Sequence, residues 1–421
     1  MKVKWQSNKK LKPQLLMDKL KGITSFDSKG IPSYSAFEKH EIDSVILTML
    51  EFDRSYSGST IRRLYSEAIH RCAIARTFNK DALLDNINAS IKKFESKRES
   101  KYVMLTSISL QGGFAVSRVE TKKATLRCWP NGMPKKYSSR YKHEWKQVGE
   151  PMPLVYCPVT VTVKAKDPMD AFVLAMFELD FVRGIHSLLV NPESELSFGE
   201  AAKLPLNKVM LGGMHSLHLE SGALVDAEIY WYESNYKVRP VLRLKNKPVT
   251  VKNLKYVLNR IELFKDGRVL RDSIVRYVRA FDEVDRNVTI QKLWAALESI
   301  LSAGENNADA IVRRSSFMFE DRSYYAQVLE HLREYRNRNV HQGYEAENLD
   351  YHCFQLQLFF RQAIFFYLKN ANYFDGLADA NKFLDLPNSV ADLEKLRRAV
   401  EKAIVYQSPR IDEDTDVAED R

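Results

Sequence analysis

The chain has 421 residues, of which 45% are hydrophobic, 11% aromatic and 28% charged, a balance typical of globular proteins that excludes collagen-like, disulfide-scaffold and largely disordered classes. Lysine and arginine number 64 against 54 acidic residues, a net charge of +10, which favours a polyanionic partner such as nucleic acid but also serves solubility. The four cysteines are scattered, no apolar run is long enough to span a membrane, and no signal-peptide pattern follows Met1, so we expect a reduced, cytoplasmic protein.

Helical spacing dominates the first hundred residues. After a basic, poorly patterned lead over 1–32, apolar residues recur every three or four positions in 37–52 and 59–78, which predicts two helices. The stretch 90–101 is charged and is expected to be solvated. We therefore expect a mostly helical N-terminal region over 1–100.

Residues 101–250 change to a strand pattern. Asp167 suits an N-cap and Pro168 suits the first position of a helix. Because 171–189 is apolar nearly all round, this helix is expected to be buried against a sheet. An α+β domain over 101–250 is therefore predicted. Its strands are expected at 102–110, 114–119, 124–129, 154–163, 209–220, 223–233 and 237–244.

From 251 onward strand signals disappear, and 251–408 predicts an all-helical bundle. The stretch 351–367 carries more large aromatic residues than one small bundle usually buries, which predicts a self-association surface. The acidic stretch 409–421 is expected to be a disordered tail. The fold class is thus α+β multidomain. The bundle's helices are expected at 268–286, 289–303, 306–319, 321–340, 345–367 and 390–406.

One segment of the bundle, 332–343 (LREYRNRNVHQG), carries residues suited to phosphodiester chemistry. Asn337 and His341 lie about 40° apart on a helix, whereas Arg336 lies about 140° from His341 and can join them only through its long side chain. A histidine can move a proton, an arginine binds phosphate oxygens, and an amide can orient either. RNA could then be cut without a metal by its own 2′-hydroxyl. The alternative is an exposed, charged helix end.

The R-N-x-x-x-H pattern of Arg336, Asn337 and His341 resembles the motif of HEPN domains. Together with the upstream segment 293–303 (LWAALESILSA), it is similar to the ApeA-like HEPN branch. The resemblance covers about 250–405 and implies a dimer whose two motifs share one cleft. It implies metal-independent and cofactor-free RNA cleavage that leaves a 2′,3′-cyclic phosphate. Many such proteins are toxins or effectors of bacterial anti-phage defence.

The resemblance also bears on neighbouring residues and partners. Glu298 stands where related domains often place an acidic residue facing the cleft, although a solvent-facing glutamate is an equal alternative. Arg333 or Arg338 could share or replace the role of Arg336. The adjoining domain would respond to a phage-derived trigger or a regulatory partner protein. A homodimer through the bundle is expected.

Two other functions remain open. The chain could be a non-catalytic HEPN module for dimerisation or RNA binding in a regulatory or toxin–antitoxin complex. Alternatively, the acidic tail could mimic nucleic acid and occupy a basic cleft.

A basic, aromatic segment supports RNA as the partner. Residues 101–150 contain ten lysines and arginines against three acidic residues, and such charge can follow phosphates while aromatic rings stack on bases. A solvated basic loop is the equal alternative. His186 is expected in the core, and His215 and His218 fall on opposite faces of a strand, so no metal site is predicted. The candidate RNA-binding residues are Lys122, Lys123, Arg127, Trp129, Lys135, Lys136, Arg140 and Lys142.

Overall fold

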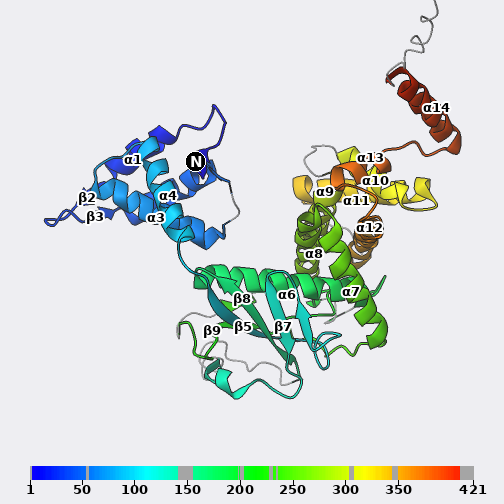
Figure 1. The fold of residues 1–421 in the computed structure, drawn as a ribbon, viewed down its shortest axis with the longest axis horizontal. Coiled ribbons are helices and arrows are strands. Elements are labelled where there is room, and N and C mark those ends of the chain that lie inside the picture. The colour runs from blue at the N-terminus through cyan, green and yellow to red at the C-terminus, as the bar shows by residue number, and fades with distance from the viewer. Residues whose placement is uncertain are drawn as a thin grey trace, which may run out of the picture. The chain divides into compact units, whose positions relative to one another are not determined.

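A computed structural model gives a mixed helix-and-sheet protein (Figure 1). Two compact units divide the chain: Met1–His186 with Lys208–Val251, and Ser187–Asn207 with Lys252–Arg421. The predicted parts 1–100 and 101–250 thus fall largely within the first unit. The residues that the structure describes are 2–53, 56–140, 155–197, 199, 203–226, 231–233, 236–302, 308–343 and 349–407.

The N-terminal part contains more structure than the sequence predicts. The helices expected at 37–52 and 59–78 correspond to α2 and α3. The poorly patterned lead over 1–32, for which no element is predicted, contains a helix and short strands, and a further helix, α4, fills 80–95. Strands of three residues are too short to show a period. The elements are β1 (Val3–Trp5), α1 (Pro13–Gly22), β2 (Thr24–Phe26), β3 (Pro32–Tyr34), α2 (Ala36–Met49), β4 (Leu50–Phe52), α3 (Gly58–Ile74) and α4 (Lys80–Glu95).

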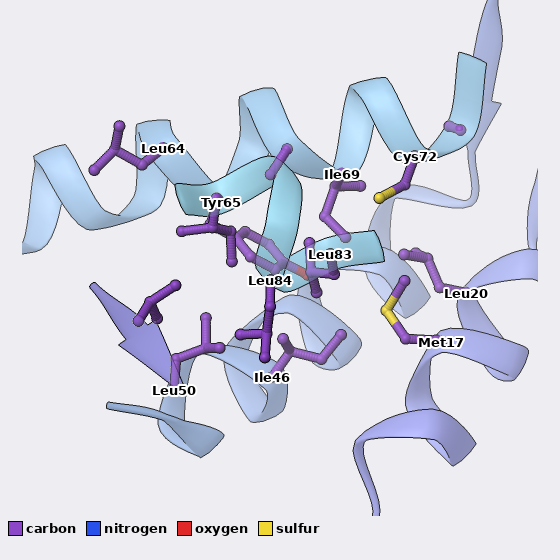
Figure 2. Packing of buried hydrophobic residues seen from close by; sticks show 14 of the residues in the cluster. Met17, Leu20, Ile46, Leu50, Leu64, Tyr65, Ile69, Cys72, Leu83 and Leu84 are labelled. Carbon is purple, nitrogen blue, oxygen red and sulfur yellow. The ribbon is translucent and has the colours of Figure 1, made fainter. Parts of the chain in front are cut away.

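Side-chain caps and a shared apolar core hold these helices together. Ser57 Oγ accepts a hydrogen bond from Thr60 N at 3.2 Å at the start of α3, and Asn79 Oδ1 accepts one from Ala82 N at 2.7 Å at the start of α4. Each cap satisfies a backbone donor that the helix leaves open. Figure 2 shows the core they enclose, in which Met17, Leu20, Ile46, Leu64, Tyr65, Ile69, Cys72 and Leu83 are buried.

The first unit also contains a six-stranded antiparallel sheet with the strand order β10-β9-β5-β8-β7-β6. The central strand β5 pairs with both neighbours, so that Met104 lies opposite Val161 and Leu217. This sheet confirms strands within 101–250. Its members are β5 (Ser100–Ile108), β6 (Arg118–Glu120), β7 (Ala124–Cys128), β8 (Cys157–Ala165), β9 (Met214–Leu219) and β10 (Trp231–Tyr232).

The predicted strand at 237–244 is wrong. This segment makes one isolated bridge, between Leu110 and Leu242, and no strand. Pro240 interrupts it and has no N–H to donate to a ladder.

Helix α6 (Pro168–Val190) begins as predicted. The Asp167 carboxylate accepts a hydrogen bond from Met169 N at 2.9 Å, and Pro168 is the first helical residue. Figure 1 shows α6 lying along the sheet, and the ring of Phe172 stacks on Trp231 of β10 at 3.7 Å. The helix is thus held against the sheet, as its apolar sequence requires.

Among its described residues, the second unit contains helices and no strand. All six predicted helices have counterparts, and α7 and α13 are additional. A buried stripe on α9, including Leu293, Leu297 and Ile300, lies in the core of this bundle. The helices are α7 (Lys247–Leu263), α8 (Gly267–Phe281), α9 (Arg286–Leu301), α10 (Ala308–Phe317), α11 (Arg322–Gln342), α12 (Leu349–Lys369), α13 (Leu377–Leu384) and α14 (Val390–Gln407). The acidic stretch 409–421 lies outside the described residues.

Most aromatic residues of α12 are buried or half-buried, whereas Tyr351 is 49% exposed. Phe359 and Phe360 are fully buried, and Phe366 packs on Phe374 and Phe383 within the same chain. The ring of Phe360 stacks on that of Tyr277 of α8, and Phe359 packs on Phe319, so these rings lie in the core of their own chain. Self-association of the bundle stays a prediction. Exposed apolar side chains gather instead on α14, which has no buried residue and leaves Ile404 59% exposed.

Candidate functional site

The motif lies in the last two turns of α11. The helix starts where Asp321 Oδ1 accepts a hydrogen bond from Tyr324 N at 3.1 Å. It ends at Gly343, whose positive φ of 64° suits a residue without a Cβ and whose N–H donates to Asn339 O. Leu329, Leu332 and Tyr335 are buried, so they define the packed face of the helix.

The motif residues point in different directions from α11. Measured from Leu332, an ideal helix places Arg336 about 40° away, on the packed face, and His341 about 180° away, on the outer face. Arg336 and Asn337 are half-buried and His341 is exposed. Arg336 Nη1 donates a hydrogen bond to Asn337 Oδ1 at 3.1 Å. The structure therefore brings Arg336 to Asn337, while His341 lies on the outer face and makes no hydrogen bond to either among the described residues.

Three arginines of this segment differ in their partners. Arg333 pairs with Asp309 and Glu330, and the hydrogen bond to Asp309 raises the pKa of its guanidinium. Arg338 Nε donates to Glu334 Oε1 at 2.9 Å. By contrast, Arg336 has no acidic partner among the described residues, and its Nε is buried without an acceptor. Arg336 is thus the arginine left open to an anion.

Helix α9 contacts the end of α11 but does not bring Glu298 to the motif. Tyr335 OH donates to Asn287 Oδ1 at 2.7 Å, and Gln291 Nε2 donates to Asn339 Oδ1 at 3.2 Å. Glu298 lies about 10 Å further along α9 than Gln291. It is half-buried and has no hydrogen bond to a motif residue in the described part of the chain.

The candidate RNA-binding residues of the first unit differ in their exposure to solvent, and not all of them are exposed. Trp129 is half-buried: its Nε1 donates to Thr160 Oγ1 at 3.0 Å, and the guanidinium of Arg127 covers its ring at 4.4 Å. The ring is therefore already held against the sheet. Lys142 lies outside the described residues. The exposed members are Lys122, Lys123, Arg127, Lys135 and Lys136.

The structure contradicts the prediction that Arg140 binds RNA. Its side chain is fully buried, and its guanidinium donates to Leu105 O and Met214 O at 2.7 Å and to Ser216 Oγ at 3.0 Å. Sequence composition could not distinguish it from the surface lysines around it. The structure makes it a cross-link between β5 and β9, because its donors satisfy carbonyl oxygens that water cannot reach.

The predicted core histidine is confirmed. His186 is fully buried, its Nδ1 lies 2.8 Å from Val182 O, and burial lowers its pKa to about 4. His215 and His218 are also buried, each with its own hydrogen-bond partners. No group of three or more metal-ligating side chains occurs among the described residues.

Sequence reasoning missed one pair of titratable side chains beside the motif. His331 on α11 and His352 on α12 face each other, with their Nε2 atoms 3.3 Å apart. Because 21 positions separate them in the chain, no local spacing could have revealed the contact. Only the packing of α11 on α12 does so.

Comparison with known proteins found no similar protein. No protein family matches the chain, and neither curated proteins nor solved structures provide a match. Among the described helices, none combines the length and apolar character needed to cross a bilayer. The motif segment 332–343 and its surroundings are therefore the basis for a functional proposal.

Proposed function

We propose that this protein is a metal-independent endoribonuclease in which Arg336, Asn337 and His341 promote attack of a 2′-hydroxyl on the adjacent phosphodiester. In the cell it would act as a cytoplasmic toxin or effector of bacterial anti-phage defence. One observation carries the proposal: Arg336 is half-buried, hydrogen-bonded to Asn337 and without an acidic partner among the described residues. A guanidinium in that state favours an anionic ligand.

The buried Nε of Arg336 supports phosphate as that anion. A buried donor without an acceptor costs about 1–3 kcal/mol, which a phosphate oxygen in hydrogen-bond contact would recover. The negative charge on the two non-bridging oxygens grows as the pentacoordinate phosphorane forms. A donor aimed at such developing charge contributes about 2.7–4 kcal/mol to catalysis. Arg336 would therefore bind the ground state and stabilise the transition state more strongly.

Two proton transfers complete the chemistry. As the 2′-oxygen attacks phosphorus, its proton passes to a base, and as the P–O5′ bond breaks, the leaving 5′-oxygen receives a proton from an acid. The products are a 2′,3′-cyclic phosphate and a 5′-hydroxyl. A neutral His341 imidazole can be the base and its protonated form the acid. In a homodimer, the second copy of the motif would supply the other transfer. Asn337 would hold Arg336 in position through Oδ1.

A second function is favoured by the position of His341. Its side chain is exposed at the C-terminal end of α11, on the opposite side from Arg336, and makes no hydrogen bond to Arg336 or Asn337 among the described residues. Such an arrangement suits a non-catalytic module that dimerises or binds RNA. The two functions differ in what the loss of His341 does to RNA.

The test is single-turnover cleavage of an end-labelled RNA in the presence of EDTA. Under the proposal, wild type leaves 2′,3′-cyclic phosphate ends and His341→Ala does not cleave. His70→Ala is the matched control, since His70 is also an exposed helical histidine but lies on α3. Equal cleavage by His341→Ala and wild type would refute the role of His341. RNA binding without cleavage by wild type would establish the non-catalytic alternative.

A further inference from the structure

Two histidines from different helices form a contact that the proposed cleavage does not use. His331 is exposed on α11 and His352 is half-buried on α12. Their Nε2 atoms lie 3.3 Å apart, and the ring planes meet at 61°. The ring of Tyr335 lies 5.0 Å from that of His352 and covers one side of the pair. Two nitrogens that can each carry a lone pair thus face each other at the edge of the bundle.

The separation of these nitrogens matches a shared metal ion. Zinc binds imidazole nitrogen at about 2.0–2.1 Å in tetrahedral geometry, which sets two ligand nitrogens about 3.3–3.4 Å apart. We propose that His331 and His352 form a two-histidine binding site for a divalent transition-metal ion of the zinc class, with water in the remaining positions. Imidazole ligands suit zinc, copper and nickel rather than magnesium or calcium.

The outer surroundings of His352 support this assignment. A histidine that binds metal through Nε2 carries its proton on Nδ1 and needs an acceptor there. His352 Nδ1 is buried without a partner, and so is Oε1 of Gln355. Gln355 follows three positions later on α12, on the same side of the helix. Rotation of its amide would pair an unsatisfied donor with an unsatisfied acceptor.

Electrostatics do not oppose a cation at this position. Burial and the neighbouring His331 lower the pKa of His352, which favours the neutral imidazole that binds a metal ion. The flanking charges on α11 are Glu330, which pairs with Arg333, and Glu334, which pairs with Arg338. Arg333 and Arg338 therefore each have an acidic partner.

A metal bound here would join α11 to α12 without touching RNA. His331 precedes Arg336 by about 7 Å along the helix axis, so the ion would steady the helix that carries the motif. The site does not depend on the proposed cleavage, since metal binding is measured without RNA. It is compatible with cleavage that persists in EDTA.

The experiment titrates zinc into the full-length chain after chelator treatment and desalting, and follows the heat of binding. Cobalt absorption in the visible range reports tetrahedral geometry at the same site. Wild type should bind one zinc ion per chain at this site, with a rise in melting temperature. His331→Ala should weaken binding by at least about 100-fold, since loss of an outer partner alone costs about 10–100-fold. Gln355→Leu should weaken it by about tenfold.

The controls separate this site from adventitious binding. His341→Ala removes another exposed histidine of α11 and should bind zinc like wild type. Because His331 is exposed, its variant should keep the metal-free melting temperature. Unchanged zinc affinity in His331→Ala, or the same loss in His341→Ala, would overturn the proposal. So would the absence of saturable binding by wild type, which would leave a simple hydrogen bond between the rings.

Discussion

Replacing Arg336 by methionine should separate catalysis from folding, because two opposing effects on stability nearly cancel at this position. The variant removes the buried Nε that has no acceptor, which recovers about 1–3 kcal/mol. It also removes the hydrogen bond from Nη1 to Asn337 Oδ1, and bonds from charged donors contribute about 1.5–3 kcal/mol. Methionine keeps the apolar stem in its packed position. The free energy of unfolding should therefore change by no more than about 1 kcal/mol.

The rate of RNA cleavage should fall far more than stability does. Loss of a donor to the developing phosphorane charge typically costs about 10²–10³-fold, which single-turnover kinetics on labelled RNA would measure beside thermal melts. Arg338→Met is the matched control, because its exposed ion pair with Glu334 is worth about 0.3–0.5 kcal/mol and its loss should leave the rate unchanged. Wild-type cleavage by Arg336→Met would refute the catalytic role. A decrease of several kcal/mol in the free energy of unfolding would instead show that Arg336 has a structural role.

Four further outcomes are expected. His341→Ala should slow cleavage by about 10²–10⁴-fold while RNA affinity in filter binding stays near wild type. Excess EDTA should leave cleavage intact, and restoration by magnesium after a loss would contradict the mechanism. Because burial lowers the pKa of His186 from 6.5 to about 4, the unfolded state binds its proton more tightly. The contribution of neutral His186 to the free energy of unfolding is therefore fully present above about pH 6.5, and it decreases by on the order of 3 kcal/mol towards pH 4. Thermal melts of His186→Gln should not show this pH dependence. The full chain should sediment as a dimer at tens of micromolar, and Ile404→Glu on the exposed face of α14 should favour the monomer; a monomeric wild type would exclude a composite site.

Local sequence patterns were sufficient to predict the long helices and strands but not the short ones. Helix α6 could be placed because Asp167, Pro168 and an apolar run act within a few residues of each other. The three-residue strands of the N-terminal part and helix α13 have too few residues to show a period. The segment 237–244 has strand-like composition, but Pro240 interrupts it, and among the described residues it makes one isolated bridge, from Leu242 to Leu110. Strand formation depends on a neighbour that the local sequence does not contain.

The sequence alone determined the chemistry available at 332–343 and the helix that carries it, since residue type and helical period are local properties. Tertiary structure decided which of those groups are free. It paired Arg333 and Arg338 with acidic residues and left Arg336 open, buried Arg140 between β5 and β9, and enclosed most rings of α12. It also brought His331 to His352 across 21 positions of sequence. Burial and ion pairing depend on what the rest of the chain places around a side chain, and that information is absent from any short segment.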